Sequence, residues 1–240
     1  MKYIADSSEP MPISNLDRLI TAARLLRPLL DELVFVGGSV AGLLITDEAA
    51  SELRPTLDVD AIAEITSYVE YATFGNRLRA LDFAEDTSEE APLCRWVNHG
   101  TILDVMPLDE AILGFSNRWY FEAMQAATTR QVAADLEIRV VSAPFFLATK
   151  LEAFKGRGKG DYLGSHDIED LIAVINGRAT LLAEVQSAPE VLQQYISREI
   201  AGFLDDLRFL DAVPGHLLPD GASQLRLGIV IERLKKLASY

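Results

Sequence analysis

The sequence contains very little cysteine and histidine, and this limits the chemistry that it can support. Cys94 is the only cysteine among 240 residues, so no intramolecular disulfide can form and folding need not depend on an oxidising compartment. The three histidines, His99, His166 and His216, are scattered along the chain. Together with one cysteine they give no zinc-ligand spacing. A disulfide scaffold and a structural zinc site are therefore excluded.

Long apolar segments are also missing. No run of residues reaches the length of a membrane span, and the N-terminus lacks a basic-then-apolar signal pattern. Apolar residues make up 49% of the chain and charged residues 24%, a balance typical of a globular protein that buries a sizeable core. We therefore expect a cytoplasmic protein with no membrane partner.

The chain lacks an excess of positive charge. Its net charge of −14 argues against a broad nucleic-acid footprint. Residues 1–110 hold 8 Lys/Arg and 20 Asp/Glu, a net charge of −12, whereas residues 111–240 hold 14 and 16, a net charge of −2. The dense basic cluster lies in this second half and consists of Lys150, Lys155, Arg157 and Lys159.

A strand, a turn and a helix are predicted at the start of the segment from Leu33 to Glu64. The apolar run 34–36 is typical of a buried strand. Gly37 and Gly38 end that run, and Ser39 can cap the helix that follows. Backbone N–H groups at such a helix start can hold a phosphate chain. The same Gly-Gly-Ser sequence is also common as a plain strand-to-helix turn.

Two aspartates are predicted on one face of the next strand. Asp58 and Asp60 alternate with apolar residues over 57–61, and successive side chains of a strand point to opposite faces. Neighbouring carboxylates repel each other and resist burial unless a cation joins them. Mg²⁺ fits this need because it takes oxygen ligands and keeps waters and substrate phosphates in its shell. The alternative is a pair of solvated acids.

The order of these residues resembles the polymerase-beta-like nucleotidyltransferases, whose signature is Gly-Ser followed by Asp-x-Asp on the next strand. The run from Arg54 to Asp60, RPTLDVD, resembles one branch, the AbiEii/AbiGii-type nucleotidyltransferase toxins, in which Arg-x-Thr-x-Asp-x-Asp recurs. The resemblance implies transfer of a nucleotidyl group from a nucleoside triphosphate to an acceptor hydroxyl. It also implies that Asp58 and Asp60 bind magnesium and that Gly38 and Ser39 bind the nucleotide.

A third acid lies in the middle of an apolar strand. Two short strands, 93–98 and 102–106, are predicted to form a hairpin around a turn at 99–100. Asp104 has apolar neighbours on the second strand. In the polymerase-beta-like enzymes a third carboxylate on a neighbouring strand completes the metal site and acts as general base, so the resemblance implies both roles for Asp104. The alternative is an aspartate that is hydrogen-bonded to the local backbone or to Arg95.

Lys150 is predicted to point to the apolar side of a helix that starts at Ser142 and Pro144. It follows Phe146 by four residues and precedes Phe154 by four, so all three share one helix face. In the toxin family a lysine on a helix after the sheet contacts nucleotide phosphates, and the resemblance implies this role for Lys150. The alternative is a snorkelling lysine, or one paired with an acid.

The next predicted helix, which Ser165 can cap, begins with two acids three residues apart, Asp167 and Asp170. The AbiEii-type family has a basic-Asp-x-x-Asp pattern here, with the first acid among its functional residues. The resemblance therefore implies that Asp167 belongs to the nucleotide site, while this chain has His166 where lysine is more usual. The alternative is that both are ordinary first-turn acids, which the helix dipole favours.

These patterns together predict an α/β fold, a small mixed sheet with flanking helices (the nucleotidyltransferase fold) followed by an α-helical region. The domains are expected at 1–143, the nucleotidyltransferase core, and 144–240, a helical domain that completes the nucleotide site. A single helix is expected over 111–126 and a short strand over 137–141.

The acceptor is less determined by the sequence. Lys155, Arg157 and Lys159 lie in a glycine-rich stretch, 155–160, that reads as a mobile basic loop suited to the phosphates of an RNA 3′ end, for example of a tRNA. If the protein is toxin-like, an antitoxin partner is expected. The alternatives are a protein acceptor, a small molecule such as an aminoglycoside, or a nucleotide- or partner-binding protein without turnover.

Overall fold

The computed structural model describes residues 13–50 and 53–239. Within these residues seven strands form one mixed sheet in the order β3-β4-β5-β2-β1-β7-β6. The strands are β1 (Leu33–Val36), β2 (Asp58–Ala63), β3 (Ala84–Glu85), β4 (Arg95–Asn98), β5 (Thr101–Met106), β6 (Thr128–Ala133) and β7 (Leu136–Val140). Strand β2 lies between β1, to which it is antiparallel, and β5, to which it is parallel. The predicted mixed sheet is confirmed.

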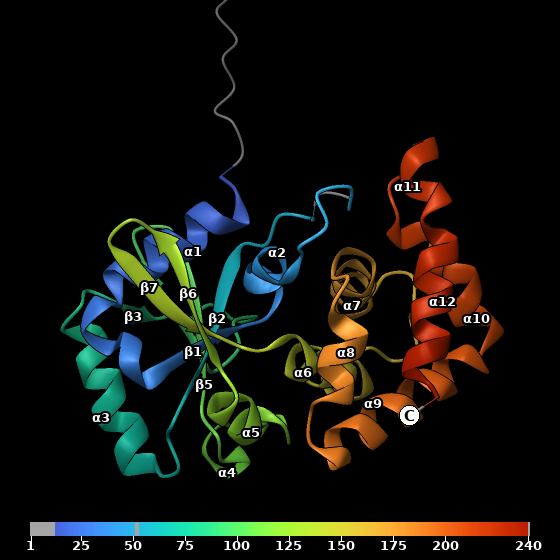
Figure 1. Ribbon diagram of the computed structural model, residues 1–240. Helices are drawn as coiled ribbons and strands as arrows, with labels where there is room; N and C mark the ends of the chain where they lie inside the picture. The colour runs from blue at the N-terminus through green and yellow to red at the C-terminus, as the bar shows by residue number, and fades with distance from the viewer. Residues whose placement is uncertain (1–12, 51–52, 240) are drawn as a thin grey trace, which may run out of the picture.

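Helices flank this sheet (Figure 1). The helices of this part are α1 (Asn15–Leu25), α2 (Ala41–Leu44), α3 (Tyr68–Arg79), α4 (Glu110–Leu113) and α5 (Tyr120–Gln125), with the 3₁₀ turns η1 (Arg27–Glu32) and η2 (Gly38–Val40). Trp96 of β4 is almost fully buried and its ring lies against Gly75 of α3. Because side chains alternate along a strand, α3 covers the sheet face opposite to Arg95.

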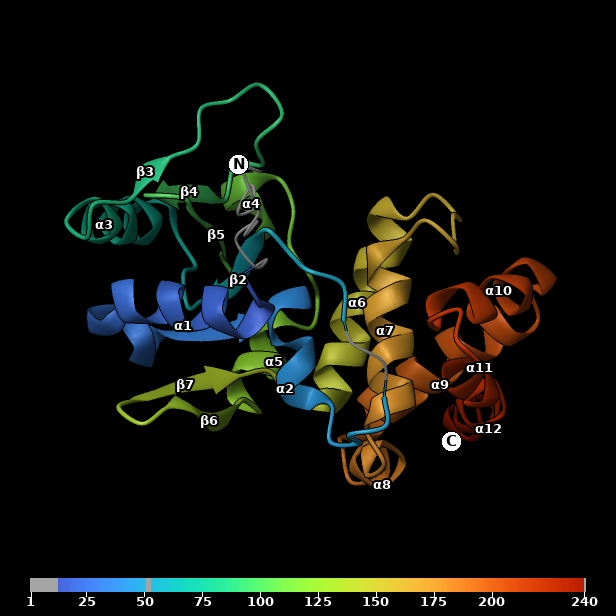
Figure 2. The same ribbon diagram turned by 90° about the horizontal axis from the view of Figure 1, so that it is seen from above.

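The predicted helical region after the sheet is also confirmed. It contains α6 (Ala143–Arg157), α7 (His166–Gly177), α8 (Leu181–Gln186), α9 (Glu190–Leu204), α10 (Leu207–Ala212), η3 (Val213–His216), α11 (Gly221–Leu225) and α12 (Leu227–Leu237). Helices α6 and α7 pack against each other between the sheet and the helices α9 to α12 (Figure 2). Within the described ranges, no helix has the length and apolar character that crossing a bilayer would require.

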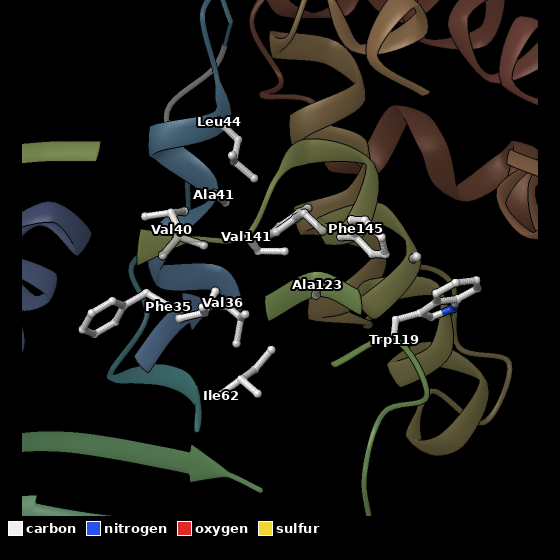
Figure 3. Close-up of a cluster of buried hydrophobic side chains, with 14 of the residues drawn as sticks. Phe35, Val36, Val40, Ala41, Leu44, Ile62, Trp119, Ala123, Val141 and Phe145 are labelled. Carbon is white, nitrogen blue, oxygen red and sulfur yellow. The ribbon is translucent and has the colours of Figure 1, made fainter. Parts of the chain in front are cut away.

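A buried apolar cluster joins the sheet to the helical region. Phe35 of β1 and Leu44 of α2 belong to the same cluster as Val141 and Phe145, at the junction of β7 and α6 (Figure 3). All four are nearly inaccessible to solvent. This packing holds the turn after β1 beside α6 and α7.

The single helix expected over 111–126 is wrong, because the chain breaks into α4 and α5. Gly114 adopts a left-handed conformation, φ +79°, and ends α4. The Asn117 side chain then donates to the Thr149 carbonyl of α6 and accepts a hydrogen bond from the Trp119 N–H. The bond to Thr149 ties the segment between α4 and α5 to α6, and the bond from Trp119 holds the chain just before α5.

Two further expectations differ from the structure. Strand β6 was not predicted, because its side chains are exposed or half-buried and show no apolar face; it pairs antiparallel with β7 at the sheet edge. The basic loop expected over 155–160 begins only at Gly158, since α6 continues to Arg157. Ion pairs of Lys155 with Glu199 and of Arg157 with Asp167 hold this last turn.

Candidate functional site

A cavity of about 1190 Å³ lies between the sheet and the helices α6 and α7. The predicted site residues Gly38, Asp58, Asp60, Asp104, Lys150 and Asp167 all line it. Three acids come from the sheet side, whereas Lys150 and Asp167 come from the helix side. The fold therefore brings residues together around one cavity although they lie up to 129 positions apart in the sequence, from Gly38 to Asp167.

The glycine turn after β1 makes room for the acids beside it. Gly37 has φ +72°, and a Cβ at this residue would lie 1.9 Å from Asp60 Oδ2. A Cβ at Gly38 would lie 2.8 Å from Thr56 Cγ2 and 3.1 Å from Asp170 Oδ2. Only glycine fits at Gly37, both for its backbone conformation and for its contact with the carboxylate.

Ser39 is the one predicted site residue that does not reach the cavity. It lies inside η2, is 3% exposed, and its Oγ donates to the Val36 carbonyl oxygen at 3.4 Å. The expected capping role is wrong, because the 3₁₀ turn begins one residue earlier, with Gly37 in the capping position and no side-chain cap. The α-helix that follows is a single turn, Ala41–Leu44.

The strand register brings the three acids to neighbouring positions. Asp60 of β2 pairs with Asp104 of the parallel strand β5, and Asp58 lies two residues earlier on the same face. Asp104 is buried, at 6% exposure, whereas Asp58 and Asp60 are half-buried. The alternation over 57–61 therefore placed both carboxylates of β2 correctly.

Arg95 binds two of these acids. In the β4–β5 hairpin it lies opposite Asp104. Its Nε donates to Asp104 Oδ1 at 2.8 Å, and its Nη2 donates to Asp104 Oδ2 at 2.8 Å and to Asp58 Oδ2 at 3.0 Å. Hydrogen bonds to Asp104 raise the pKa of Arg95 against the opposing effect of burial. The hydrogen bond between Asp104 and Arg95, which the sequence analysis gave as an alternative, is thus present.

Asp60 differs from its two neighbours because no described cation lies in direct contact with it. Within the described part of the chain no hydrogen bond or ion pair reaches its carboxylate. Burial, and then repulsion from Asp58 and Asp104, raise the pKa of Asp60 to about 7, although Lys150 and Arg157 lower it in part. The sheet side of the cavity is therefore short of positive charge at Asp60.

The donor set at this point fits one magnesium ion better than a complete three-acid site. The described residues contain no group of three side chains arranged to hold a metal ion. Both oxygens of Asp104 accept hydrogen bonds from Arg95, while no described residue pairs with Asp60 or with the second oxygen of Asp58. Mg²⁺ commonly binds through one or two carboxylates and completes its shell with waters and substrate phosphates. Asp58 and Asp60 meet that requirement.

Lys150 lies on the helix side of the cavity and is paired with two acids of α7. Its Nζ is 3.1 Å from Asp167 Oδ1 and 2.7 Å from Asp170 Oδ2. Burial opposes the charge of the ammonium group, but Asp170 and Asp167 outweigh it and raise the pKa of Lys150. The observed contact is the ion pair that the sequence left as an alternative, and the pair faces the cavity.

Two arginines that the sequence did not assign to the nucleotide site also belong to this cluster. Arg157 donates from Nε and Nη2 to the two oxygens of Asp167, both at 2.8 Å. Arg54 Nη2 is 3.6 Å from Asp170 Oδ2, and its Nε is 3.1 Å from Glu169. Burial of Asp167 opposes its charge, but the bonds from Arg157 and Lys150 outweigh burial and lower the pKa of Asp167.

The cations expected to contact an RNA end are largely engaged within the protein. Lys155 Nζ is 3.2 Å from Glu199 Oε1, and Arg157 is held by Asp167. Lys159 lines the cavity, and it forms no ion pair with the described residues.

No family model matches the chain, and no curated protein matches it. Among solved structures, a proposed nucleotidyltransferase from H. pylori is 9% identical, with a TM-score of 0.44; the match covers 93% of this chain and 91% of that one. JHP933 from Helicobacter pylori is 11% identical, with a TM-score of 0.45; the match covers 93% of each chain. Because both TM-scores are below 0.5, these likenesses do not indicate a function for this chain. The function is therefore inferred from the cavity alone.

Proposed function

We propose that this protein is a nucleotidyltransferase that uses magnesium to move a nucleotidyl group from a nucleoside triphosphate to an acceptor hydroxyl. The observation that supports this proposal is the arrangement of charge around one cavity. Asp58, Asp60 and Asp104 lie together on adjacent strands, and Lys150 and Arg157 lie across from them. Carboxylates that face cations across a space of this size suit a metal-bound polyphosphate.

The residues around the cavity would have different roles in this reaction. Asp58 and Asp60 would hold a magnesium ion, which would supply charge that stabilises the attacking and leaving oxygens. Lys150 and Arg157 are fixed in place by Asp167 and offer positive charge to the outer phosphates. In this proposal Asp104 accepts the proton of the attacking hydroxyl. For this it must be freed from Arg95, because hydrogen bonds from the guanidinium occupy both of its carboxylate oxygens.

The test is transfer of label from nucleoside triphosphates labelled at the α-phosphate, with and without magnesium, to total cellular RNA and to total protein. We expect magnesium-dependent transfer that Asp58→Asn abolishes. Asp211→Asn, which removes an exposed acid on α10 away from the cavity, is the matched control and keeps full activity. Binding of a triphosphate with neither label transfer nor pyrophosphate release would contradict the proposal and favour a nucleotide-binding protein without turnover.

For the acceptor we propose the terminal hydroxyl of an RNA, such as a tRNA. The support is Lys159, a cation at the cavity that has no carboxylate partner in the described residues. A single phosphate contact by Lys159 adds about one unit to the slope of affinity against salt concentration, and Lys159→Glu removes it. Label found only on protein, or only on an aminoglycoside added in a third arm, would replace RNA by that acceptor.

A toxin role rests on the sequence resemblance alone and is tested in cells. We expect induced expression of the protein to arrest growth and Asp58→Asn to relieve the arrest. Co-expression of the neighbouring reading frame, as the candidate antitoxin, restores growth in this proposal. Equal growth with the protein and with Asp58→Asn would contradict it.

A further inference from the structure

Arg95 ties together the three strands that carry the acids. It projects from β4, binds Asp104 of β5 through both carboxylate oxygens, and extends to Asp58 of β2. Its side chain is 22% exposed and lines the cavity. One guanidinium thus occupies the space beside two of the three carboxylates that face the cavity.

This position sets Arg95 against any divalent cation at the same acids. A cation that used Asp104 as a ligand would lie next to the guanidinium, and the two positive charges repel each other. Arginine cannot relieve this repulsion by losing its proton. The guanidinium must therefore move before Asp104 can join Asp58 and Asp60 around a metal.

The cavity offers the guanidinium an alternative partner when a nucleotide is bound. Phosphate matches the planar fork of arginine as carboxylate does, with two parallel hydrogen bonds. Because Arg95 already lines the cavity, a triphosphate there would be accessible to it. Hydrogen bonds to the nucleotide phosphates can thus replace those that Arg95 makes to Asp104.

We propose that Arg95 is a positioning residue that competes with the divalent cation for Asp104 and gives it up when the phosphates of a nucleotide accept its guanidinium. This inference rests on the proposed function. It makes metal and nucleotide bind cooperatively, because each removes an obstacle to the other, and the coupling is the same in both directions. The acid site stays incomplete until the substrate is present.

The test measures Mn²⁺ affinity in the absence of nucleotide, from the electron paramagnetic resonance signal of free Mn²⁺, which takes the same oxygen ligands as magnesium. Removing the competing charge in Arg95→Gln is expected to tighten Mn²⁺ binding about tenfold. Arg95→Lys, which cannot bind both oxygens of Asp104 at once, is expected to give a smaller gain in the same direction.

Two controls separate this effect from a general change in charge. Arg79→Gln removes one positive charge from an exposed arginine on α3 that pairs with Glu85. It leaves Mn²⁺ affinity within about twofold of the unmodified protein, because exposed charges at a distance are screened. In a chain that already carries Asp104→Asn, the gain from Arg95→Gln becomes much smaller, since the contested carboxylate is gone and only the contact of Arg95 with Asp58 remains.

A second measurement tests the coupling directly. A non-hydrolysable triphosphate analogue should tighten Mn²⁺ binding to the unmodified protein more than to Arg95→Gln. Circular dichroism checks that each variant is folded, and Arg95→Lys replaces Arg95→Gln if the latter does not fold.

The outcomes separate this inference from the proposed function. Mn²⁺ binding by the unmodified protein with no gain in either Arg95 variant overturns the competition and leaves the nucleotidyltransferase proposal standing. A gain of undiminished size in the Asp104→Asn background overturns it as well. Absence of Mn²⁺ binding in every variant, with and without nucleotide, overturns both.

Discussion

The two sides of the cavity are both built from ionised side chains, yet their charges are balanced very differently. On the helix side Lys150, Arg157 and Arg54 face three acids of α7, and each of these acids has a cation within 4 Å. On the sheet side Arg95 pairs with Asp58 and Asp104, and no ion pair within the described residues reaches Asp60. Each described acid on the helix side therefore has a cation close by, whereas the sheet side is short of positive charge.

This difference shows what each side is suited to do. A buried ion pair is stable once made and costly to break, so the helix side can hold Lys150 and Arg157 at fixed positions. Crowded carboxylates without matching cations destabilise the fold, and such groups cluster where a protein binds a cation or performs chemistry. The raised pKa of Asp60 is the clearest sign of this deficit.

The largest expected effect comes from removing a metal-binding acid on the sheet side. Asp58→Asn should lower nucleotidyl transfer by about a thousandfold or more, because it removes a ligand of the ion that stabilises the transition state. The rate of label transfer at saturating triphosphate measures this, with circular dichroism as the check on folding. A loss of less than about tenfold would remove Asp58 from the site.

On the helix side the expected effect is on stability. Lys150→Met leaves Asp167 and Asp170 without a shared cation and should lower the free energy of unfolding by about 3 kcal/mol. Urea denaturation at pH 7.5 measures it. Adding Asp170→Asn should recover part of the loss, because one uncompensated charge disappears. A change below about 1 kcal/mol would show that solvent screens this pair.

A smaller loss is expected at the turn between the two sides. Gly37→Ala forces a side chain into a left-handed conformation and against the Asp60 carboxylate. We expect it to lower the free energy of unfolding by about 2 kcal/mol. Gly221→Ala, at an exposed glycine whose Cβ meets nothing within 4 Å, is the control and should be near neutral. Equal stabilities of the two variants would mean that the turn relaxes around the added methyl group.

The smallest expected effect is a pH-dependent gain in the free energy of unfolding of the Asp60→Asn variant. Because folding raises the pKa of Asp60 to about 7, the folded chain binds this proton more tightly than the unfolded chain. Wild-type stability should therefore fall as pH rises from about 4 to about 7. Asp60→Asn removes this loss, so its advantage is near zero at pH 4 and reaches about 1 kcal/mol at pH 8.

Thermal unfolding from pH 4 to pH 8 measures the gain of Asp60→Asn. Magnesium at high concentration should narrow the difference at pH 8, because the ion relieves the same repulsion in the unmodified protein. A constant difference across the pH range would show that ionisation of Asp60 is not its cause.

Much of the sheet side could be predicted from local patterns. Alternation over 57–61 gave the shared face of Asp58 and Asp60. Arg95 and Asp104 lie at equal distances from the turn at 99–100, so the hairpin register itself places them opposite each other. The contact of Arg95 with Asp58 was not accessible in this way, because it depends on the parallel pairing of β2 with β5.

The helix side was harder to predict, because its contacts cross between separate elements. Arg157 follows Lys150 by seven residues and so shares its helix face, a signal that could have been used. The glycines around Arg157 instead suggested a loop, and its bond with Asp167 of α7 overrides them. Arg54 reaches Asp170 from a connecting segment, and no periodicity links two such residues.

Crystals grown with Mn²⁺ and a non-hydrolysable triphosphate analogue would show whether Asp58 and Asp60 hold a divalent cation together with a nucleotide. We expect an anomalous manganese peak about 2.2 Å from oxygens of both Asp58 and Asp60 and in contact with the phosphates. We also expect Asp104 to be released from Arg95. A bound triphosphate with no manganese at these two acids would show that they do not form the metal site.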